Sequence, residues 1–128
     1  MSDQPRRILL VEDDRFLRKA AETTLKQQGY TVITAADGEE ALRLARSGPL
    51  DLILLDLIMP KLQGFEVLRA LKADAATAAT PVIILSNLGQ ESDVRQAMEA
   101  GAAGYFVKAN LSLQDLVKRV GEVLGGAA

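Results

Sequence analysis

The sequence contains no histidine, no cysteine and no tryptophan, and only 4% of its residues are aromatic. Without histidine, the chain has no imidazole base, no imidazole metal ligand and no residue that can form phosphohistidine. Without cysteine, disulfides and thiolate chemistry are excluded, which is compatible with a reducing cytoplasm, and we expect a cytoplasmic location. The core must be packed mainly from aliphatic side chains, since hydrophobic residues make up 48% of the chain.

A long apolar run and a strong charge of one sign are also missing. No apolar stretch reaches the roughly 18 residues of a spanning helix, and the N-terminus lacks a signal-peptide core. The net charge is only −2, so neither nucleic acid nor a membrane is expected as a direct partner. A chain of 128 residues suits one domain, and we expect a single domain over 1–128 with a flexible tail at 125–128.

Short apolar runs alternate with segments of helical periodicity. The run Leu52–Leu55 is typical of a strand buried on both faces of a sheet. Strands are predicted at 6–11, 31–35, 52–56, 81–86 and 104–107, and helices at 16–28, 37–46, 64–73, around 94–100 and 112–124. In the first helix, Phe16, Leu17, Ala21 and Leu25 are expected to form the apolar face. Asp37 with Glu40, and Ser112 with Asp115, have the spacing of structural capping boxes.

Five strand–helix pairs with apolar strands indicate a parallel sheet covered by helices on both faces. Right-handed crossover connections leave few topologies for such a chain. We predict an α/β fold with a doubly wound, five-stranded parallel sheet in the order 2-1-3-4-5. This is a flavodoxin-like sandwich of three layers.

Polar side chains follow four of the predicted strands. Glu12 and Asp13 follow the first strand, Asp56 and Ser86 end the third and fourth, and Lys108 follows the fifth. In an open parallel sheet, all of these face the crevice beyond the carboxyl ends of the strands, where ligands bind.

Three carboxylates in one crevice repel one another, and cations relieve that repulsion. Mg²⁺ prefers oxygen ligands, and the ammonium of Lys108 suits a phosphate group. A carboxylate held by a metal and a lysine is a workable nucleophile toward phosphorus, which would give an aspartyl phosphate. The Ser86 hydroxyl would donate to an oxygen of the transferring phosphoryl group.

Each residue also has a structural interpretation. Asp13 or Asp14 alone is more often a helix N-cap, and Asp56 alone caps a turn about as often as it carries chemistry. Ser86 alone is usually a turn hydroxyl, and Lys108 alone is usually a solvated surface charge. The functional interpretation depends on the coincidence of all four strand ends.

Five motifs follow one another in a specific order and spacing: ILLVEDD at 8–14, AADGEEAL at 35–42, DLILLDLIMP at 51–60, PVIILS at 81–86 and GAAGYFVK at 101–108. With these motifs, the chain resembles the receiver domain of bacterial two-component response regulators over nearly its whole length. The resemblance implies that Asp56 is the phospho-acceptor and that Lys108 binds the phosphoryl group. Ser86 would be the switch hydroxyl, and Tyr105 the aromatic residue that changes rotamer on activation.

The resemblance also implies a Mg²⁺ site. Asp13 and Asp56 would be direct ligands, Glu12 would act largely through water, and the backbone carbonyl of Ile58 would complete the protein ligands. Asp14 lies one residue past the acidic pair and is not expected to be a ligand.

As a response regulator receiver, the chain would act in phosphorelay signal transduction. The donor would be a sensor histidine kinase or a histidine phosphotransfer protein, since this chain has no histidine of its own. Families of this kind usually also accept small donors such as acetyl phosphate, so the chain would catalyse its own phosphotransfer without being an enzyme. It would be a single-domain regulator or the receiver of a longer protein, and its output partner or output domain stays open.

Several positions depart from the family pattern. Ala109 follows Lys108 where proline is usual; a cis bond here would cost about 2.5–4 kcal/mol, and both isomers stay open. Asn87 stands where a small residue usually follows the hydroxyl. Ile58 and Leu88, two residues past the acceptor and the hydroxyl, cannot orient a water, which favours slow dephosphorylation.

Two other classes of function remain open. A pseudo-receiver would act only as a protein-interaction module without phosphorylation. A flavodoxin-like cofactor binder would need a phosphate-binding loop rich in Ser, Thr or Gly after the first strand, where this chain has Glu12, Asp13 and Asp14.

Overall fold

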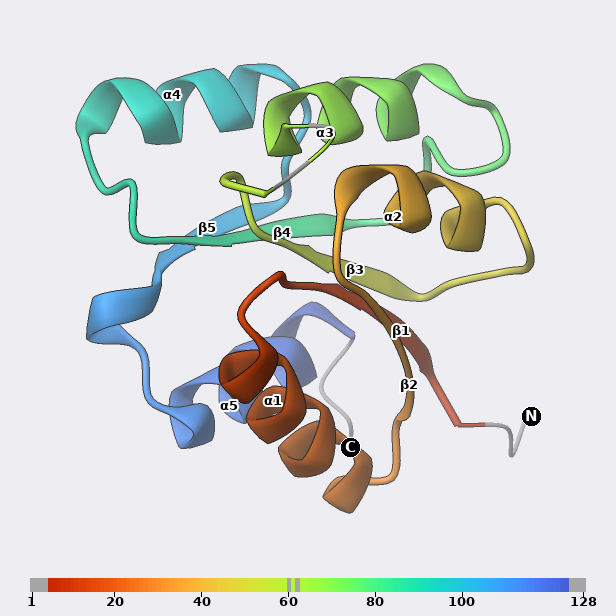
Figure 1. The fold of residues 1–128 in the computed structure, drawn as a ribbon, viewed down its shortest axis with the longest axis vertical. Coiled ribbons are helices and arrows are strands. Elements are labelled where there is room, and N and C mark those ends of the chain that lie inside the picture. Colours follow the sequence, from red (N-terminus) through yellow and green to blue (C-terminus); the bar gives the residue numbers. More distant parts are fainter. Residues whose placement is uncertain (1–4, 60, 62, 125–128) are drawn as a thin grey trace.

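The computed structural model describes residues 5–59, 61 and 63–124, so the expected tail and Pro60 of the third motif lie outside the described residues (Figure 1). The strands are β1 (Arg7–Val11), β2 (Thr31–Ala35), β3 (Leu52–Leu55), β4 (Val82–Ser86) and β5 (Gly104–Val107). The α-helices are α1 (Arg15–Gln27), α2 (Gly38–Ala45), α3 (Gly64–Ala73), α4 (Glu91–Glu99) and α5 (Leu113–Val123). A 3₁₀ turn, which the sequence pattern did not predict, covers Lys108–Asn110.

The sheet has five parallel strands in the order β2-β1-β3-β4-β5, as predicted. Helices α1 and α5 cover one face, and α2, α3 and α4 cover the other (Figure 1). Val11 pairs with Ala35 on one side and with Leu55 on the other, so β1, β2 and β3 end level with one another. Ser86 pairs with Val107, so the ends of β4 and β5 are also adjacent. This register brings the carboxyl ends of all five strands to one edge of the sheet.

The core lies on both faces of the sheet, because side chains alternate along each strand. Leu52 and Leu54 belong to a cluster with Leu25 of α1 and Leu116 of α5. Ile53 and Leu55 belong to the opposite cluster, with side chains of α2, α3 and α4. All four β3 side chains are fully buried, as the apolar run predicted.

Two residues of the expected apolar face are exposed. Phe16 is 87% exposed and Leu17 is 40% exposed, whereas Ala21 and Leu25 are buried. Leu17, Ala21 and Leu25 are spaced four residues apart and form one stripe of α1, while Phe16 is rotated about 100° from that stripe. The prediction of Phe16 in the apolar face was therefore wrong.

The capping predictions were right for α5 and half right for α2. Ser112 and Asp115 each accept a hydrogen bond from the other's backbone N–H, which makes a complete capping box. Asp37 Oδ1 accepts from the backbone N of Glu40 at 2.8 Å. The Glu40 carboxylate, however, accepts from the backbone N of Ala36 rather than from Asp37.

In the part of the chain that the structure describes, no helix combines the length and the hydropathy that crossing a membrane requires.

Candidate functional site

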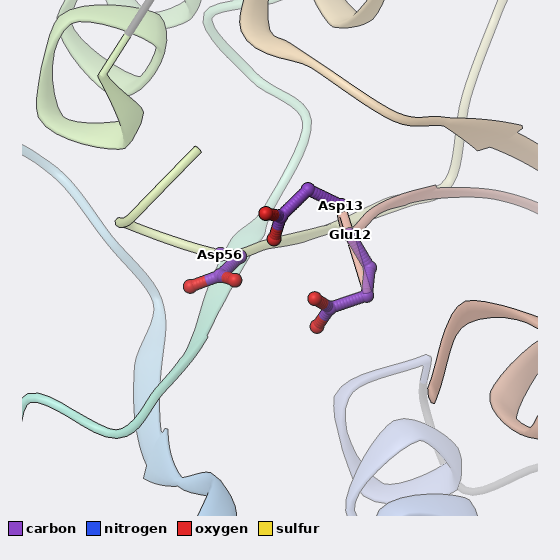
Figure 2. Close-up of side chains that lie close together, drawn as sticks. All are labelled: Glu12, Asp13 and Asp56. Atoms are coloured by element: carbon purple, nitrogen blue, oxygen red, sulfur yellow. The ribbon is translucent and has the colours of Figure 1, made fainter. Parts of the chain in front are cut away.

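Three carboxylates converge at the carboxyl edge of the sheet. Glu12 and Asp13 follow β1, Asp56 follows β3, and each offers an oxygen within 4.8 Å of the other two (Figure 2). Glu12 and Asp56 are only 4% and 5% exposed, whereas Asp13 is exposed. This cluster was predicted from the strand ends, and the level ends of β1 and β3 explain why it forms.

Lys108 joins the two buried carboxylates. Its Nζ lies 2.5 Å from Glu12 Oε1 and 2.8 Å from Asp56 Oδ2. Burial alone would lower the pKa of Lys108, but its hydrogen bonds to Asp56 and Glu12 outweigh this effect and leave that pKa raised. Lys108 is therefore an ammonium at neutral pH, and it partly neutralises the site.

Backbone N–H groups hold the other oxygen of each buried carboxylate. Asp14 N donates to Glu12 Oε2 at 3.0 Å, and Ile58 N donates to Asp56 Oδ1 at 3.2 Å. Burial nevertheless raises the pKa of Glu12, against the opposing hydrogen bond from Lys108. Three carboxylates face one ammonium at this site, an excess of negative charge that favours the binding of a cation.

The sequence left open whether Asp13 or Asp14 is the N-cap of the first helix, and in the structure it is Asp14. Its Oδ1 accepts from the backbone N of Leu17 at 3.0 Å, and its backbone has an extended conformation. Asp14 therefore begins α1, and among the described residues it is not one of the three clustered carboxylates.

Ser86 and Tyr105 are connected through Leu88. Ser86 is fully buried, and its Oγ accepts from the backbone N of Leu88 at 3.1 Å. The hydroxyl of half-buried Tyr105 donates to the backbone carbonyl of Leu88. Burial raises the pKa of Tyr105, so the hydroxyl keeps its proton at neutral pH. The two predicted switch residues therefore contact the same backbone segment.

The peptide bond between Lys108 and Ala109 is trans. The question that the sequence left open is settled by this observation. The chain turns through the 3₁₀ segment directly after β5, and from there Lys108 reaches both carboxylates.

Sequence reasoning missed two residues that shape the site. Arg18 of α1 donates from Nη1 to the backbone carbonyls of Glu12 and Asp13, at 2.9 Å and 3.3 Å. Gly64, the first residue of α3, lies so close to the loop after β3 that a Cβ would be 2.4 Å from the Asp56 carbonyl oxygen. Arg18 follows the acidic pair in the first turn of α1, and its position in the sequence does not show that it contacts these backbone carbonyls.

The donor set of the acidic cluster suits a hard divalent cation. All three side chains offer carboxylate oxygens, which Mg²⁺ and Ca²⁺ prefer. In an octahedral Mg²⁺ site with bonds of about 2.1 Å, opposite oxygens are about 4.2 Å apart. The oxygens of the three side chains lie within 4.8 Å of one another, which is close to this span.

A doubly wound sheet with three acids, a lysine and a buried hydroxyl at its carboxyl edge defines a class of α/β signalling domains. The family model of the response regulator receiver domain matches residues 8–121. The chain belongs to this family, whose members receive signals in two-component regulatory systems.

Curated relatives agree with this assignment. The chain is 42% identical over 114 residues to a gliding motility regulatory protein of Myxococcus xanthus, covering 89% of this chain and 15% of that protein. It is also 42% identical over 118 residues to the transcriptional regulatory protein CpxR of Escherichia coli, covering 92% of this chain and 49% of that protein. The chain thus spans half or less of the length of these relatives.

Solved structures show the same fold. The chemotaxis protein CheY4 of Vibrio cholerae has a TM-score of 0.87 and 32% sequence identity, over 93% of this chain and 98% of that one. The receiver domain of a sensor histidine kinase from Pseudomonas aeruginosa has a TM-score of 0.86 and 30% identity, over 94% of this chain and 98% of that one. That structure contains a magnesium ion coordinated in its active site cleft.

Proposed function

We propose that Asp56 accepts a phosphoryl group from the phosphohistidine of a sensor histidine kinase or a phosphotransfer protein. The observation that carries this proposal is the convergence of Lys108, Glu12 and Asp13 on one buried aspartate. One oxygen of Asp56 would form the new bond to phosphorus, while the bond from phosphorus to the donor's imidazole nitrogen breaks. The donor acts in trans, because this chain contains no histidine.

The chain's own groups are placed to assist this transfer. The ammonium of Lys108, 2.8 Å from Asp56 Oδ2, would neutralise charge on the oxygens of the phosphoryl group. The Ser86 hydroxyl, at the end of the adjacent strand β4, would donate to another of these oxygens. The Ile58 N–H holds Asp56 Oδ1 and orients the carboxylate. In this proposal the chain catalyses its own phosphotransfer and acts as a signalling domain.

We assign Mg²⁺ as the cofactor. Asp13, Asp56 and the backbone carbonyl of Ile58 would be direct ligands, and Glu12 would act mainly through water. Mg²⁺ would supply positive charge next to the transferring phosphoryl group. Glu12 is hydrogen-bonded to Lys108 and to Asp14 N, which suits an indirect role at the metal.

The signal would leave the site through Ser86, Leu88 and Tyr105. A phosphoryl group on Asp56 attracts the Ser86 hydroxyl, and the hydrogen bond from Leu88 N to Ser86 Oγ connects that movement to the carbonyl that Tyr105 contacts. The surface formed by α4, β5 and α5 would then change its affinity for an output partner or output domain. Binding of that partner would in turn favour phosphorylation. We expect this to take place in the cytoplasm, with residues 1–128 acting as one receiver domain.

The test is incubation with acetyl phosphate and Mg²⁺, followed by intact mass measurement. The parent should gain one phosphoryl group, while Asp56→Asn and the parent without Mg²⁺ should gain none. No gain in the parent, together with no response to beryllofluoride and Mg²⁺, would identify a pseudo-receiver instead.

The same sample reports the lifetime of the aspartyl phosphate. Ile58, with its side chain 55% exposed, and half-buried Leu88 both lack a polar group that could orient an attacking water. After removal of the donor, the phosphoryl group should persist for minutes or more, and Leu88→Glu should shorten this time. Release within seconds from the parent would contradict slow autodephosphorylation.

A further inference from the structure

The backbone of the acidic loop, Glu12–Asp14 between β1 and α1, is held by the side chain of Arg18. Arg18 Nη1 donates to the carbonyl oxygen of Glu12 at 2.9 Å and to that of Asp13 at 3.3 Å. Arg18 is half-buried, and the backbone N of Glu12 is held from the other side by the Ala35 carbonyl at 3.0 Å. Consecutive carbonyls bound to one cation determine how the two peptide units, and therefore the two side chains, are oriented.

This contact matters most for Asp13. The carboxylates of Glu12 and Asp56 are held by Lys108 and by backbone N–H groups. Among the described residues, no hydrogen-bond donor reaches the carboxylate of Asp13, which is also the exposed member of the cluster. Its direction toward the other two acids is therefore determined by its backbone, and Arg18 holds that backbone.

The charge of Arg18 should affect Mg²⁺ affinity in the opposite direction from its contact with the backbone. A guanidinium bound to the backbone of Glu12 and Asp13 adds positive charge near the cation site, so charge alone predicts that removing Arg18 strengthens Mg²⁺ binding. A positioning role predicts the reverse, because a misdirected Asp13 is a poorer ligand. The two effects have different signs, which makes them separable by experiment.

We propose that Arg18 is a positioning residue for the cation site and orients Asp13 through the carbonyls of Glu12 and Asp13. This inference rests on the proposed function, since it assumes that the cluster binds Mg²⁺. It assigns to α1 a part in metal binding that its sequence does not reveal.

The test compares Arg18→Met with Arg15→Met by calorimetric titration of the metal-free protein with Mg²⁺ at fixed ionic strength. Both substitutions remove one positive charge from the first turn of α1. Arg15 is exposed and, in the described part of the chain, has no hydrogen bond to the loop, so it is the matched control. Arg18→Met should bind Mg²⁺ about tenfold more weakly than the parent, the order expected for a hydrogen bond from a charged donor. Arg15→Met should bind with parental or slightly higher affinity.

Amide hydrogen exchange without Mg²⁺ gives a second measurement. Exchange at Glu12 and Asp14, whose N–H groups donate to the Ala35 carbonyl and to Glu12 Oε2, should be faster in Arg18→Met, while β2 stays as protected as in the parent. A general loss of stability would instead raise exchange in both places.

Three results would contradict the inference. Equal Mg²⁺ affinity in Arg18→Met and Arg15→Met overturns it and leaves the proposed function standing. No Mg²⁺ binding by the parent overturns both. If Arg18→Met does not fold, Arg18→Lys replaces it, because lysine keeps the charge but is shorter; parental affinity in that variant also overturns the inference.

Discussion

Lys108 connects carboxylates that come from two different strands, and both of them are buried. Taking Glu12 and Asp56 out of water is unfavourable unless a cation compensates their charge, and Lys108 reaches both at hydrogen-bonding distance. A divalent cation would bring further positive charge to the same carboxylates. Lys108 alone does not neutralise the site, because one ammonium faces three clustered carboxylates.

Gly64 is the residue at which an added methyl group should do the most damage. A Cβ there would lie 2.4 Å from both the Asp56 carbonyl oxygen and Leu57 Cα, which are backbone atoms that cannot turn away. Gly64 N also donates to the Leu57 carbonyl at 2.9 Å, so the first turn of α3 is fixed against the loop after β3. Gly64→Ala should lower the free energy of unfolding in urea by about 1–3 kcal/mol or more.

The control for this substitution is Gly48→Ala. Its Cβ would find only the end of the Arg7 side chain, at 3.7 Å, so the change in stability should stay within about 0.5 kcal/mol. Parental stability in Gly64→Ala would mean that the loop after β3 can shift to accommodate the methyl group at little cost. The close approach would then have no part in holding Asp56.

At the scale of elements, α5 begins with a complete capping box, and this gives a prediction. Ser112 Oγ accepts from the backbone N of Asp115 at 3.0 Å, and Asp115 Oδ2 accepts from the backbone N of Ser112 at 3.2 Å. Ser112→Ala should lower the free energy of unfolding by about 1 kcal/mol, because one N–H of the first turn loses its acceptor. Ser92→Ala, at an exposed position in the first turn of α4, should change stability by only a few tenths of that.

The same box should make stability depend on pH in the acid range. Its backbone hydrogen bond from Ser112 holds the pKa of Asp115 below the usual value of 3.8. A depressed folded-state pKa contributes stability above the unfolded pKa, and this contribution is lost as the pH falls through the folded pKa. The stability advantage of the parent over Asp115→Asn, which removes the titrating carboxylate, should therefore shrink as the pH falls below 3.8, and a constant difference down to that range would contradict this account.

How much of these elements the sequence could predict depended on burial. β3 was predicted almost residue for residue, because four consecutive apolar side chains leave few alternatives. The face of α1 was predicted less well, because the apolar residues Phe16 and Leu17 are both exposed and only Ala21 and Leu25 of the expected face are buried. The 3₁₀ turn after Lys108 has no apolar pattern, so nothing in the sequence marked it.

At the scale of the whole molecule, the site was predictable because a parallel sheet aligns its strand ends. Glu12, Asp56, Ser86 and Lys108 could be assigned to one edge from sequence order and strand order alone. Arg18 could not, because its role depends on which backbone carbonyls it reaches, and a helical repeat does not show that. The residues that the sequence missed act on the backbone of the site, whereas those it found act through their own side chains.

Under the proposed function, Mg²⁺ should stabilise the whole molecule, since the folded chain brings the three acids together and the unfolded chain does not. At a Mg²⁺ concentration of about 100 times Kd, this linkage adds about 2.7 kcal/mol to the free energy of unfolding. Thermal unfolding of the parent should therefore shift to higher temperature as Mg²⁺ is added, and chelation should reverse the shift.

Asp13→Asn separates this effect from general charge screening. Without Mg²⁺ the variant should be as stable as the parent or more stable, because one of three mutually repelling carboxylates is gone. With Mg²⁺, Asp13→Asn should lose most of the stabilisation, because the carboxylate of Asp13, a proposed direct ligand, is missing. Glu99→Gln removes an exposed carboxylate at the far end of α4 and should keep the full Mg²⁺ response. An equal shift in all three proteins would mean that Mg²⁺ acts on surface charge and that the converging acids do not form its site.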